Sequence, residues 1–373
     1  MPRQRKAHHK SRAGCTQCKE RHIRCDEAHP RCLNCKRLEL HCSFASLTLV
    51  TMPGNNDSLA DFELLDYWYR HPLLPGSVEQ DRELRHAYVR LGFSYPFLLS
   101  SILALVSLRR FDEDRTCTRW YIRAIAHQQA AISLSRPYLH RLESPHQKAI
   151  LAFSTFTSLY AVAEPLHRPA SRYLACSEFD PVEEFVHAMR LSRGSSAFVQ
   201  HHLRSVIASD AFMAAKYSPV QLKAACDLEA PFPQLRTLRN AILGISEDCE
   251  RRAVYLDAVE RLFVCMNILL DSDNGNDNDN AGNSHRLMVI FAWTQEVDRT
   301  FWDLCSARHP VALVIMGHFA ALMSLKQGIW FLQHWPVVLL RYIQEKVTDG
   351  RWGDLLRWPV GIVSRGDRVA CFS

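Results

Sequence analysis

The stretch that decides the fold of this protein is CTQCKERHIRCDEAHPRCLNCKRLELHC, residues 15–42. Its cysteines follow the spacing C-x2-C-x6-C-x6-C-x2-C-x6-C, in which the first three positions recur 17 residues later. Each half places a C-x2-C turn at the start of a short helix and returns a third thiolate one to two turns later. The repeat predicts a small metal module over residues 15–43, built from Cys15, Cys18, Cys25, Cys32, Cys35 and Cys42.

Six thiolates suit two zinc ions if two sulfurs are shared. Zinc prefers four ligands in a tetrahedron, so two ions need eight ligand positions. The pseudo-twofold symmetry of the repeat makes Cys15 and Cys32, the first cysteine of each half, the natural bridges. One ion would then bind Cys15, Cys18, Cys25 and Cys32, and the other would bind Cys15, Cys32, Cys35 and Cys42.

Two other interpretations stay open for this module. A single zinc ion could use four of the six sulfurs, which would leave two reactive thiols. Histidine could replace a sulfur, although six regular cysteines need no substitute and solvent-facing rings are the simpler reading of His22, His29 and His41. Because so small a unit has little apolar core, metal binding, about 10–16 kcal/mol in small zinc modules, must supply most of its folding energy.

The positive charge of the chain is concentrated at the same end. Residues 1–45 hold eleven Lys and Arg against four Asp and Glu, a net charge of +7, so the other 328 residues of the +6 chain sum to −1. We expect residues 1–14 to form a basic arm that contacts phosphates or acts as a nuclear localisation signal. A merely solvated run of charge is the alternative interpretation of Arg3, Arg5, Lys6, Lys10 and Arg12.

Residues 12–44 resemble the fungal binuclear zinc-cluster transcription factors without a gap. The resemblance rests on RAGCTQCK at residues 12–19, CDE at 25–27, PRC at 30–32, NC at 34–35 and CSF at 42–44. It implies a nuclear, sequence-specific regulator of RNA polymerase II genes that binds double-stranded DNA. In that family the helix after the second cysteine docks in the major groove, a mode typical of zinc-cluster modules.

Mapping that helix onto this chain gives residues 19–24. Arg21 is the candidate for base readout, since Arg pairs with guanine O6 and N7 through two hydrogen bonds. Lys19 and Arg24 would contact phosphates, together with Lys10 and Arg12 of the arm. The sequence departs from the family where a second Lys or Arg is usual, because position 22 is His and Glu20 adds a negative charge. His22 can still donate a hydrogen bond to guanine.

The rest of the chain predicts a mainly α protein, with a linker over 44–60 and an all-α regulatory domain over 61–373. Start signals such as Asp180-Pro181-Val182-Glu183 precede apolar residues at helical spacing. Residues 271–283, rich in Asp and Asn, predict a disordered loop. No sustained heptad follows the linker, so we expect monomeric binding or a homodimer formed through the large domain rather than a zipper.

A weaker resemblance over residues 62–359 points to the sterol-uptake-control branch of these regulators. The matching blocks are LLDY at residues 64–67, YPFLL at 95–99, ILAL at 102–105, HPVALVIMGHF at 309–319 and WGDLLRWP at 352–359. The resemblance implies a pocket for a sterol or another apolar small molecule near Trp330, Phe331 and Trp335. Simple core packing of these aromatics is the alternative, as is a regulator of a secondary-metabolite gene cluster with no sterol ligand.

Several other classes of protein are not favoured by the sequence. Motifs for a metalloprotease, a serine hydrolase or a phosphate-binding loop do not occur, so we expect no enzyme. The apolar runs 97–108 and 310–325 fall short of the roughly 20 residues that a bilayer needs. Without a signal peptide, the seven scattered cysteines of the 13 are expected to be reduced and buried.

Overall fold

The fold is known from a computed structural model that describes most of the chain in separate stretches. The described residues are 15–23, 25–27, 32–38, 55–71, 73, 78–139, 146–168, 179–202, 232–245, 248–274, 281–324 and 329–370. Four of the predicted site residues lie outside them, namely Lys10, Arg12, Arg24 and Cys42. The chain forms two compact units, Met1–Glu63 and Leu64–Ser373.

The first unit contains two five-residue helices, α1 (Thr16–Glu20) and α2 (Leu33–Arg37), which contact each other. Each begins directly after a cysteine that serves as its N-cap. The side chains of the five described cysteines are buried together, so sulfur atoms take the place of an aliphatic core in this unit.

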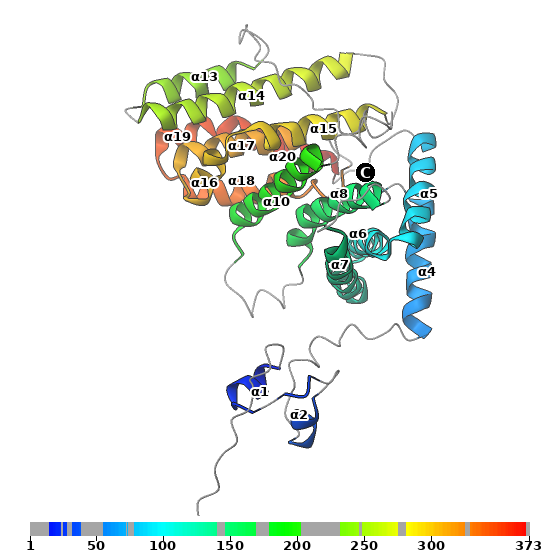
Figure 1. Ribbon diagram of the computed structural model, residues 1–373. Coiled ribbons are helices and arrows are strands. Elements are labelled where there is room, and N and C mark those ends of the chain that lie inside the picture. The colour runs from blue at the N-terminus through cyan, green and yellow to red at the C-terminus, as the bar shows by residue number, and fades with distance from the viewer. Residues whose placement is uncertain are drawn as a thin grey trace, which may run out of the picture. The chain divides into compact units, whose positions relative to one another are not determined.

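The rest of the described chain is helical, and no strand occurs in its described residues (Figure 1). This confirms the mainly α prediction. The first helices are α4 (Asn55–Arg70), α5 (Val78–Ser94), α6 (Pro96–Glu113), α7 (Thr118–Leu139), α8 (Gln147–Ala163), the 3-10 helix η2 (Glu164–His167) and α10 (Pro181–His202). The later ones are α13 (Pro233–Leu243), α14 (Cys249–Asn274), α15 (Ala281–Glu296), α16 (Arg299–Ser306), α17 (Pro310–Ser324), α18 (Trp335–Lys346), α19 (Gly350–Leu355) and α20 (Arg357–Ala370).

Two groups of helices make up the large unit, and α10 joins them. Helices α5 to α8 pack on one another around α6, whose residues 101–108 are all buried. In the second group α17 is central: its residues 311–323 are all buried, and it contacts α14, α16, α18, α19 and α20. Helix α10 contacts α8 on one side and α15, α16 and α18 on the other, as the crossing of these ribbons in Figure 1 illustrates.

One predicted helix start is confirmed in atomic detail. Helix α10 begins at Pro181, and the carboxylate of Asp180 accepts a hydrogen bond from the backbone N–H of Glu183 at 3.0 Å. The same carboxylate also accepts a hydrogen bond from the hydroxyl of Tyr342 at 2.6 Å and pairs with Arg308. The start signal therefore also ties α10 to α18 and to the turn before α17.

Two predicted boundaries change. Helix α4 already begins at Asn55, so residues 55–60 are helical rather than linker. Helix α14 continues to Asn274 and α15 begins at Ala281, so residues 271–274 and 281–283 of the expected loop are helical, and residues 275–280 lie outside the described residues. Helix propagation adds one hydrogen bond for each residue fixed, so a packed helix can extend into polar sequence that would not form a helix alone.

Among the described helices, one stretch, Gln147–His167, is long and apolar enough to cross a membrane. It was not among the apolar runs singled out from the sequence. Of its most apolar window, 67% is buried inside the protein, where α8 packs against α6 and α10. This burial fits a core helix of the bundle.

Candidate metal centre and nucleic-acid interface

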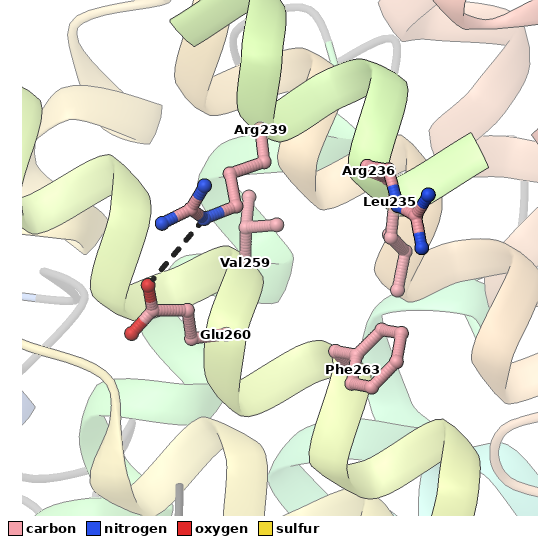
Figure 2. A pocket seen from close by; sticks show the side chains of 6 residues that line it. All are labelled: Leu235, Arg236, Arg239, Val259, Glu260 and Phe263. Atoms are coloured by element: carbon pink, nitrogen blue, oxygen red, sulfur yellow. Dashed lines mark ion pairs between the residues drawn. The ribbon is translucent and has the colours of Figure 1, made fainter. Parts of the chain in front are cut away.

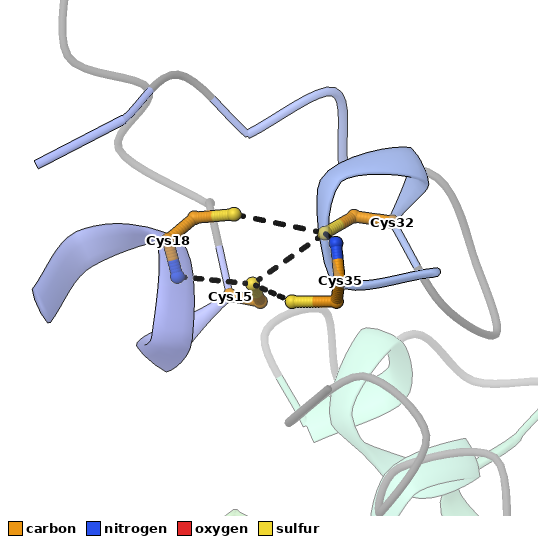
Figure 3. Close-up of side chains that lie close together, drawn as sticks. All are labelled: Cys15, Cys18, Cys32 and Cys35. Atoms are coloured by element: carbon orange, nitrogen blue, oxygen red, sulfur yellow. Dashed lines mark hydrogen bonds between the residues drawn. The ribbon is translucent and has the colours of Figure 1, made fainter. Parts of the chain in front are cut away.

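The sulfur atoms of four cysteines converge between α1 and α2. Figure 3 shows Cys15 and Cys18 facing Cys32 and Cys35 across a small space. All four Sγ atoms lie within 4.8 Å of one another, and all four side chains are buried. Cys25 belongs to the same cluster, because its sulfur lies within 4.8 Å of that of Cys32.

The distances between these sulfurs fit zinc coordination. Sulfurs at about 2.3 Å from zinc in a tetrahedron lie about 3.8 Å from one another. The Sγ atom of Cys15 lies 3.7 Å from that of Cys32 and 3.7 Å from that of Cys35, while Cys18 and Cys32 are 3.6 Å apart. Each of these pairs shares an ion in the predicted assignment with bridges at Cys15 and Cys32, so the donor set fits two zinc ions.

The two halves of the cluster have the same backbone geometry. Cys15 has φ −60° and ψ 155°, and Cys32 has φ −64° and ψ 150°. The sulfur of each accepts a hydrogen bond at 3.4 Å from the backbone N–H three residues later, that of Cys18 or Cys35. The repeat in the sequence is therefore a repeat in structure, with Cys15 and Cys32 in equivalent positions.

Backbone N–H groups also stabilise charge on the third cysteine of the first half. Burial raises the pKa of the Cys25 thiol, but the N–H groups of Cys15 and Glu27, each 3.4 Å from its sulfur, lower the pKa overall. Burial raises the pKa of Cys15 and Cys18, whose thiols lie against other thiols. Zinc, when bound, supplies the positive charge that keeps such crowded sulfurs ionised.

Asp26 connects the first half of the cluster to the second. Its two carboxylate oxygens accept the backbone N–H of Leu33, the first residue of α2, at 3.1 and 3.2 Å. A carboxylate at a helix N-terminus satisfies a free N–H and interacts favourably with the helix dipole. Sequence reasoning missed this contact, because Asp26 lies seven residues before the N–H that it caps.

The helix predicted to contact DNA is shorter than expected. Helix α1 ends at Glu20, and the chain then reverses in a Schellman motif: His22 N–H donates to Lys19 O at 3.1 Å, and Ile23 N–H donates to Cys18 O at 3.0 Å. His22 has φ 52°, a left-handed conformation that few residues adopt but in which His is enriched. The residue that differs from the Lys or Arg usual in the resembled family, His22, is therefore also the residue with a left-handed backbone.

This reversal places the predicted DNA-contacting residues on an exposed helix end. Lys19 lies in the last turn of α1, and Arg21 is its C-cap residue. The side chains of Lys19, Glu20, Arg21 and His22 are all exposed. Among residues 19–23, the described part of the predicted span, Lys19 and Glu20 are helical, because the Schellman hydrogen bonds close helix α1 after Glu20.

The aromatic residues considered for a ligand pocket lie in the core of the large unit. The indole N–H of Trp330 donates to the carbonyl of Leu73 at 3.1 Å, and that of Trp335 donates to the carbonyl of Val162 at 2.9 Å. Phe331 is buried and packs edge-on against Trp330. The three side chains fill space between helices, and both indole N–H groups are hydrogen-bonded. This arrangement agrees with the alternative that they simply pack in the core.

A cavity does occur between α13 and α14. Figure 2 shows Arg239 and Glu260 at its edge, with side-chain atoms 3.7 Å apart, and Phe263 from α14 facing Leu235. The space it offers to water-sized molecules is about 10 Å³, whereas pockets for drug-sized ligands hold roughly 300–1,000 Å³. The described lining is Leu235, Arg236, Arg239, Val259, Glu260 and Phe263.

Comparisons with known proteins agree with the metal centre. Residues 13–48 match the family described as the fungal Zn(2)-Cys(6) binuclear cluster domain. A Zn(2)-C6 fungal-type transcription factor of Gibberella zeae is 55% identical over 42 residues, 11% of this chain and 8% of the relative. Sterol uptake control protein 2 of Candida albicans is 41% identical over 59 residues, 16% of this chain and 8% of the relative.

A longer similarity links the chain to the Zn(2)-C6 fungal-type transcription factor afumD of Aspergillus fumigatus. The two are 30% identical over 125 residues, 28% of this chain and 34% of the relative. The chain thus spans about a third or less of the length of these relatives. No solved structure matches it. With its sulfur geometry and its spacing in agreement, the segment 13–48 belongs to the fungal Zn(2)-Cys(6) binuclear cluster domain family and binds two zinc ions through its cysteines.

Proposed function

We propose that this chain is a zinc-dependent, sequence-specific DNA-binding protein that regulates RNA polymerase II transcription in the nucleus. The observation that carries the proposal is the exposed end of α1, where a buried sulfur cage presents Lys19 and Arg21 to solvent. The family of residues 13–48 and the printed names of the relatives support the same function, which requires no catalytic step.

The chemistry of this helix end suits the edge of a guanine. The guanidinium of Arg21 donates two hydrogen bonds to O6 and N7, while the ammonium of Lys19 is a point charge suited to a phosphate. Glu20 lies between them in sequence, and its carboxylate repels phosphates. Tight binding should therefore require that Arg21 contacts a guanine and Lys19 contacts a phosphate at the same time. Lys10, Arg12 and Arg24 would add phosphate contacts from outside the described residues.

Selection of bound sequences from a random pool tests the proposal. The zinc-loaded full chain should enrich one short motif, and the same protein treated with a zinc chelator should enrich none. The control variant is Leu243→Gln, which changes an exposed residue of the large unit and should select the same motif as the wild type. Failure of the zinc-loaded chain to enrich any motif would contradict the proposal.

For the large unit, we infer a regulatory domain without a bound sterol, as in a regulator of a secondary-metabolite gene cluster. The support is the filled core around Trp330 and Trp335, whose indole N–H groups both donate to backbone carbonyls. The printed name of the Candida albicans relative supports the opposite hypothesis, a sterol or another apolar ligand.

Thermal unfolding of the full chain with ergosterol separates these two hypotheses. A filled core should give the same melting temperature at all sterol concentrations. A saturable rise in melting temperature, accompanied by a change in tryptophan fluorescence, would favour the sterol hypothesis, because a ligand that binds only the folded state stabilises it. Pairing of two chains through this unit stays a prediction that sedimentation velocity can test.

A further inference from the structure

The chain turns tightly around the sulfur of Cys25. The backbone N–H of Glu27 donates to this sulfur at 3.4 Å, and the N–H of Cys15 donates to it at the same distance. Glu27 has φ 56°, a left-handed conformation that few residues adopt. Asp26 lies inside this turn, so the geometry that holds a predicted zinc ligand also limits where the side chain of Asp26 can reach.

The carboxylate of Asp26 lies beside one predicted zinc ligand from each half of the module. A carboxylate oxygen of Asp26 and the sulfurs of Cys25 and Cys32 all lie within 4.8 Å of one another. Cys25 is the third cysteine of the first half, and Cys32 is the first cysteine of the second half. Asp26 is therefore close to a ligand that the two predicted zinc ions share.

Asp26 also holds the backbone next to Cys32. Both of its oxygens accept the N–H of Leu33, at 3.1 and 3.2 Å, and Leu33 directly follows Cys32. The sulfur of Cys32 itself accepts the N–H of Cys35 at 3.4 Å. One contact thus fixes the backbone after Cys32, and the other fixes its sulfur.

A role as a direct zinc ligand fits Asp26 poorly. With bridges at Cys15 and Cys32, the six cysteines already fill four positions on each ion. Six thiolates also carry more negative charge than two divalent ions neutralise, so the centre as a whole does not attract a carboxylate. The hydrogen bonds to Leu33 are what the observed geometry offers Asp26 instead.

We propose that Asp26 is a positioning residue of the metal centre, which holds the start of α2 so that Cys32 can contact both zinc ions. Residues that orient metal ligands commonly change metal affinity by about 10–100-fold. The proposal rests on the predicted bridge at Cys32, which the zinc content of Cys32→Ala and Cys18→Ala tests independently.

Competition with a zinc chelator tests this role in the zinc-loaded full chain. Asp26→Ala removes the acceptor and should weaken zinc binding at least about tenfold. Asp26→Asn keeps an acceptor oxygen without the charge, so its zinc affinity should stay within about threefold of wild type. Glu20→Ala removes another exposed acid of the same module and should also stay within about threefold.

Tryptophan fluorescence provides a check on the rest of the molecule. Residues 1–63 contain no tryptophan, so this signal reports the large unit alone. It should be the same in all of these variants. A loss of zinc by Asp26→Ala is then a property of the metal centre.

Cobalt spectra separate positioning from a simple loss of helix stability. Cobalt(II) can replace zinc in thiolate sites, and its charge-transfer bands depend on the arrangement of the sulfurs. At saturating cobalt, Asp26→Ala should have altered bands, whereas Asp26→Asn should match the wild type. Lys36→Gly destabilises α2 at an exposed position, and it should match the wild type once saturated.

The Cys18→Ala background shows through which cysteine Asp26 acts. In the predicted assignment this chain keeps one ion, and that ion does not use Cys25. Addition of Asp26→Ala should still weaken its binding at least about tenfold, because Asp26 acts through Cys32.

Four results would overturn the proposal. The first is equal zinc affinity in Asp26→Ala and Glu20→Ala. The second is an equal loss in Asp26→Asn and Asp26→Ala, which would assign the effect to charge or direct coordination. The third is a wild-type cobalt spectrum for saturated Asp26→Ala. The fourth is an unchanged affinity when Asp26→Ala is added to Cys18→Ala, since Asp26 would then act through Cys25. None of these measurements involves DNA, so the proposed function can fail separately.

Discussion

Nε2 of His167 lies 3.0 Å from Oδ1 of Asp112, and both side chains are buried. The other ring nitrogen, Nδ1, lies 2.6 Å from the carbonyl oxygen of Ala163. The Asp112 carboxylate and the Ala163 carbonyl are both hydrogen-bond acceptors, so each ring nitrogen of His167 faces an acceptor. The pair joins the end of α6 to the turn after α8, and His167 also packs edge-on against Trp330.

Asp112→Asn should destabilise the large unit. An amide removes the negative charge that pairs with Arg109 and Arg115, and breaking one side of a largely buried ion pair costs about 3 kcal/mol. Unfolding by urea, followed through tryptophan fluorescence, measures the loss. Asp66→Asn is the control: Asp66 pairs with Arg70 on an exposed helix face, so its removal should cost less than about 1 kcal/mol.

The contribution of Asp112 should also depend on pH. Burial raises the pKa of this carboxyl, but hydrogen bonds from His167 and Arg115 outweigh burial and lower the pKa to about 2, from 3.8. A lowered folded-state pKa means that the stabilisation is fully present above about pH 4 and is lost as the pH falls through 2. The difference in unfolding free energy between wild type and Asp112→Asn should therefore shrink between pH 5 and pH 2, and a constant difference would contradict this origin.

Replacement of a bridging cysteine should remove more zinc than replacement of a terminal one. Cys32→Ala takes a ligand from both ions, whereas Cys18→Ala takes a ligand from one. Native mass spectrometry should therefore find chains with no zinc for Cys32→Ala and chains with one zinc for Cys18→Ala. Cys249→Ala, an exposed cysteine of the large unit, should keep both ions. Equal zinc loss in Cys32→Ala and Cys18→Ala would argue against the bridges.

His22→Gly should stabilise the zinc module while it removes one of the side chains proposed to contact DNA. Glycine adopts φ 52° without the steric cost of a Cβ, so the gain should be up to about 1 kcal/mol. His22→Val should lose stability, because a β-branched residue is disfavoured there. Competition with a zinc chelator reports module stability, and Gly and Val variants of equal stability would exclude this explanation.

Arg21 and Lys19 should differ in what their loss does to DNA binding. Arg21 is the proposed base-reading residue, so Arg21→Ala should reduce the preference for the selected motif over a scrambled sequence by about 1–3 kcal/mol. Lys19 is the proposed phosphate contact, so Lys19→Ala should weaken binding of both sequences equally, with a shallower salt dependence. Titrations of both DNAs at several salt concentrations measure the two effects, and the opposite pattern would reverse the assignment.

The metal centre was largely predictable from sequence because its ligands are close in the chain. Cysteine spacing determines which sulfurs can meet, and the contacts of Cys15 with Cys32 and Cys35 fit the predicted sharing. The end of α1 was not predictable in the same way. The left-handed position at a helix end is usually occupied by Gly or Asn, which can be recognised in a sequence, but this chain has His22 there.

In the large unit, apolar periodicity predicted the helices, but it did not predict the polar contacts that join one helix to another. Asp112 and His167 are 55 residues apart, and Asp180 and Tyr342 are 162 residues apart. Only tertiary packing brings such residues together.

Each half of the zinc module contains one further hydrogen bond in an equivalent position, and this equivalence has an evolutionary consequence. The N–H of Arg21 donates to Gln17 O at 3.2 Å, and the N–H of Leu38 donates to Asn34 O at 3.2 Å. Leu38, 40% exposed, thus occupies in the second half the place that Arg21 occupies in the first. A substitution of Leu38 by Arg would place a second guanidinium at the equivalent position without altering any metal ligand. The duplicated module could therefore evolve recognition of a new DNA sequence through a change of one codon.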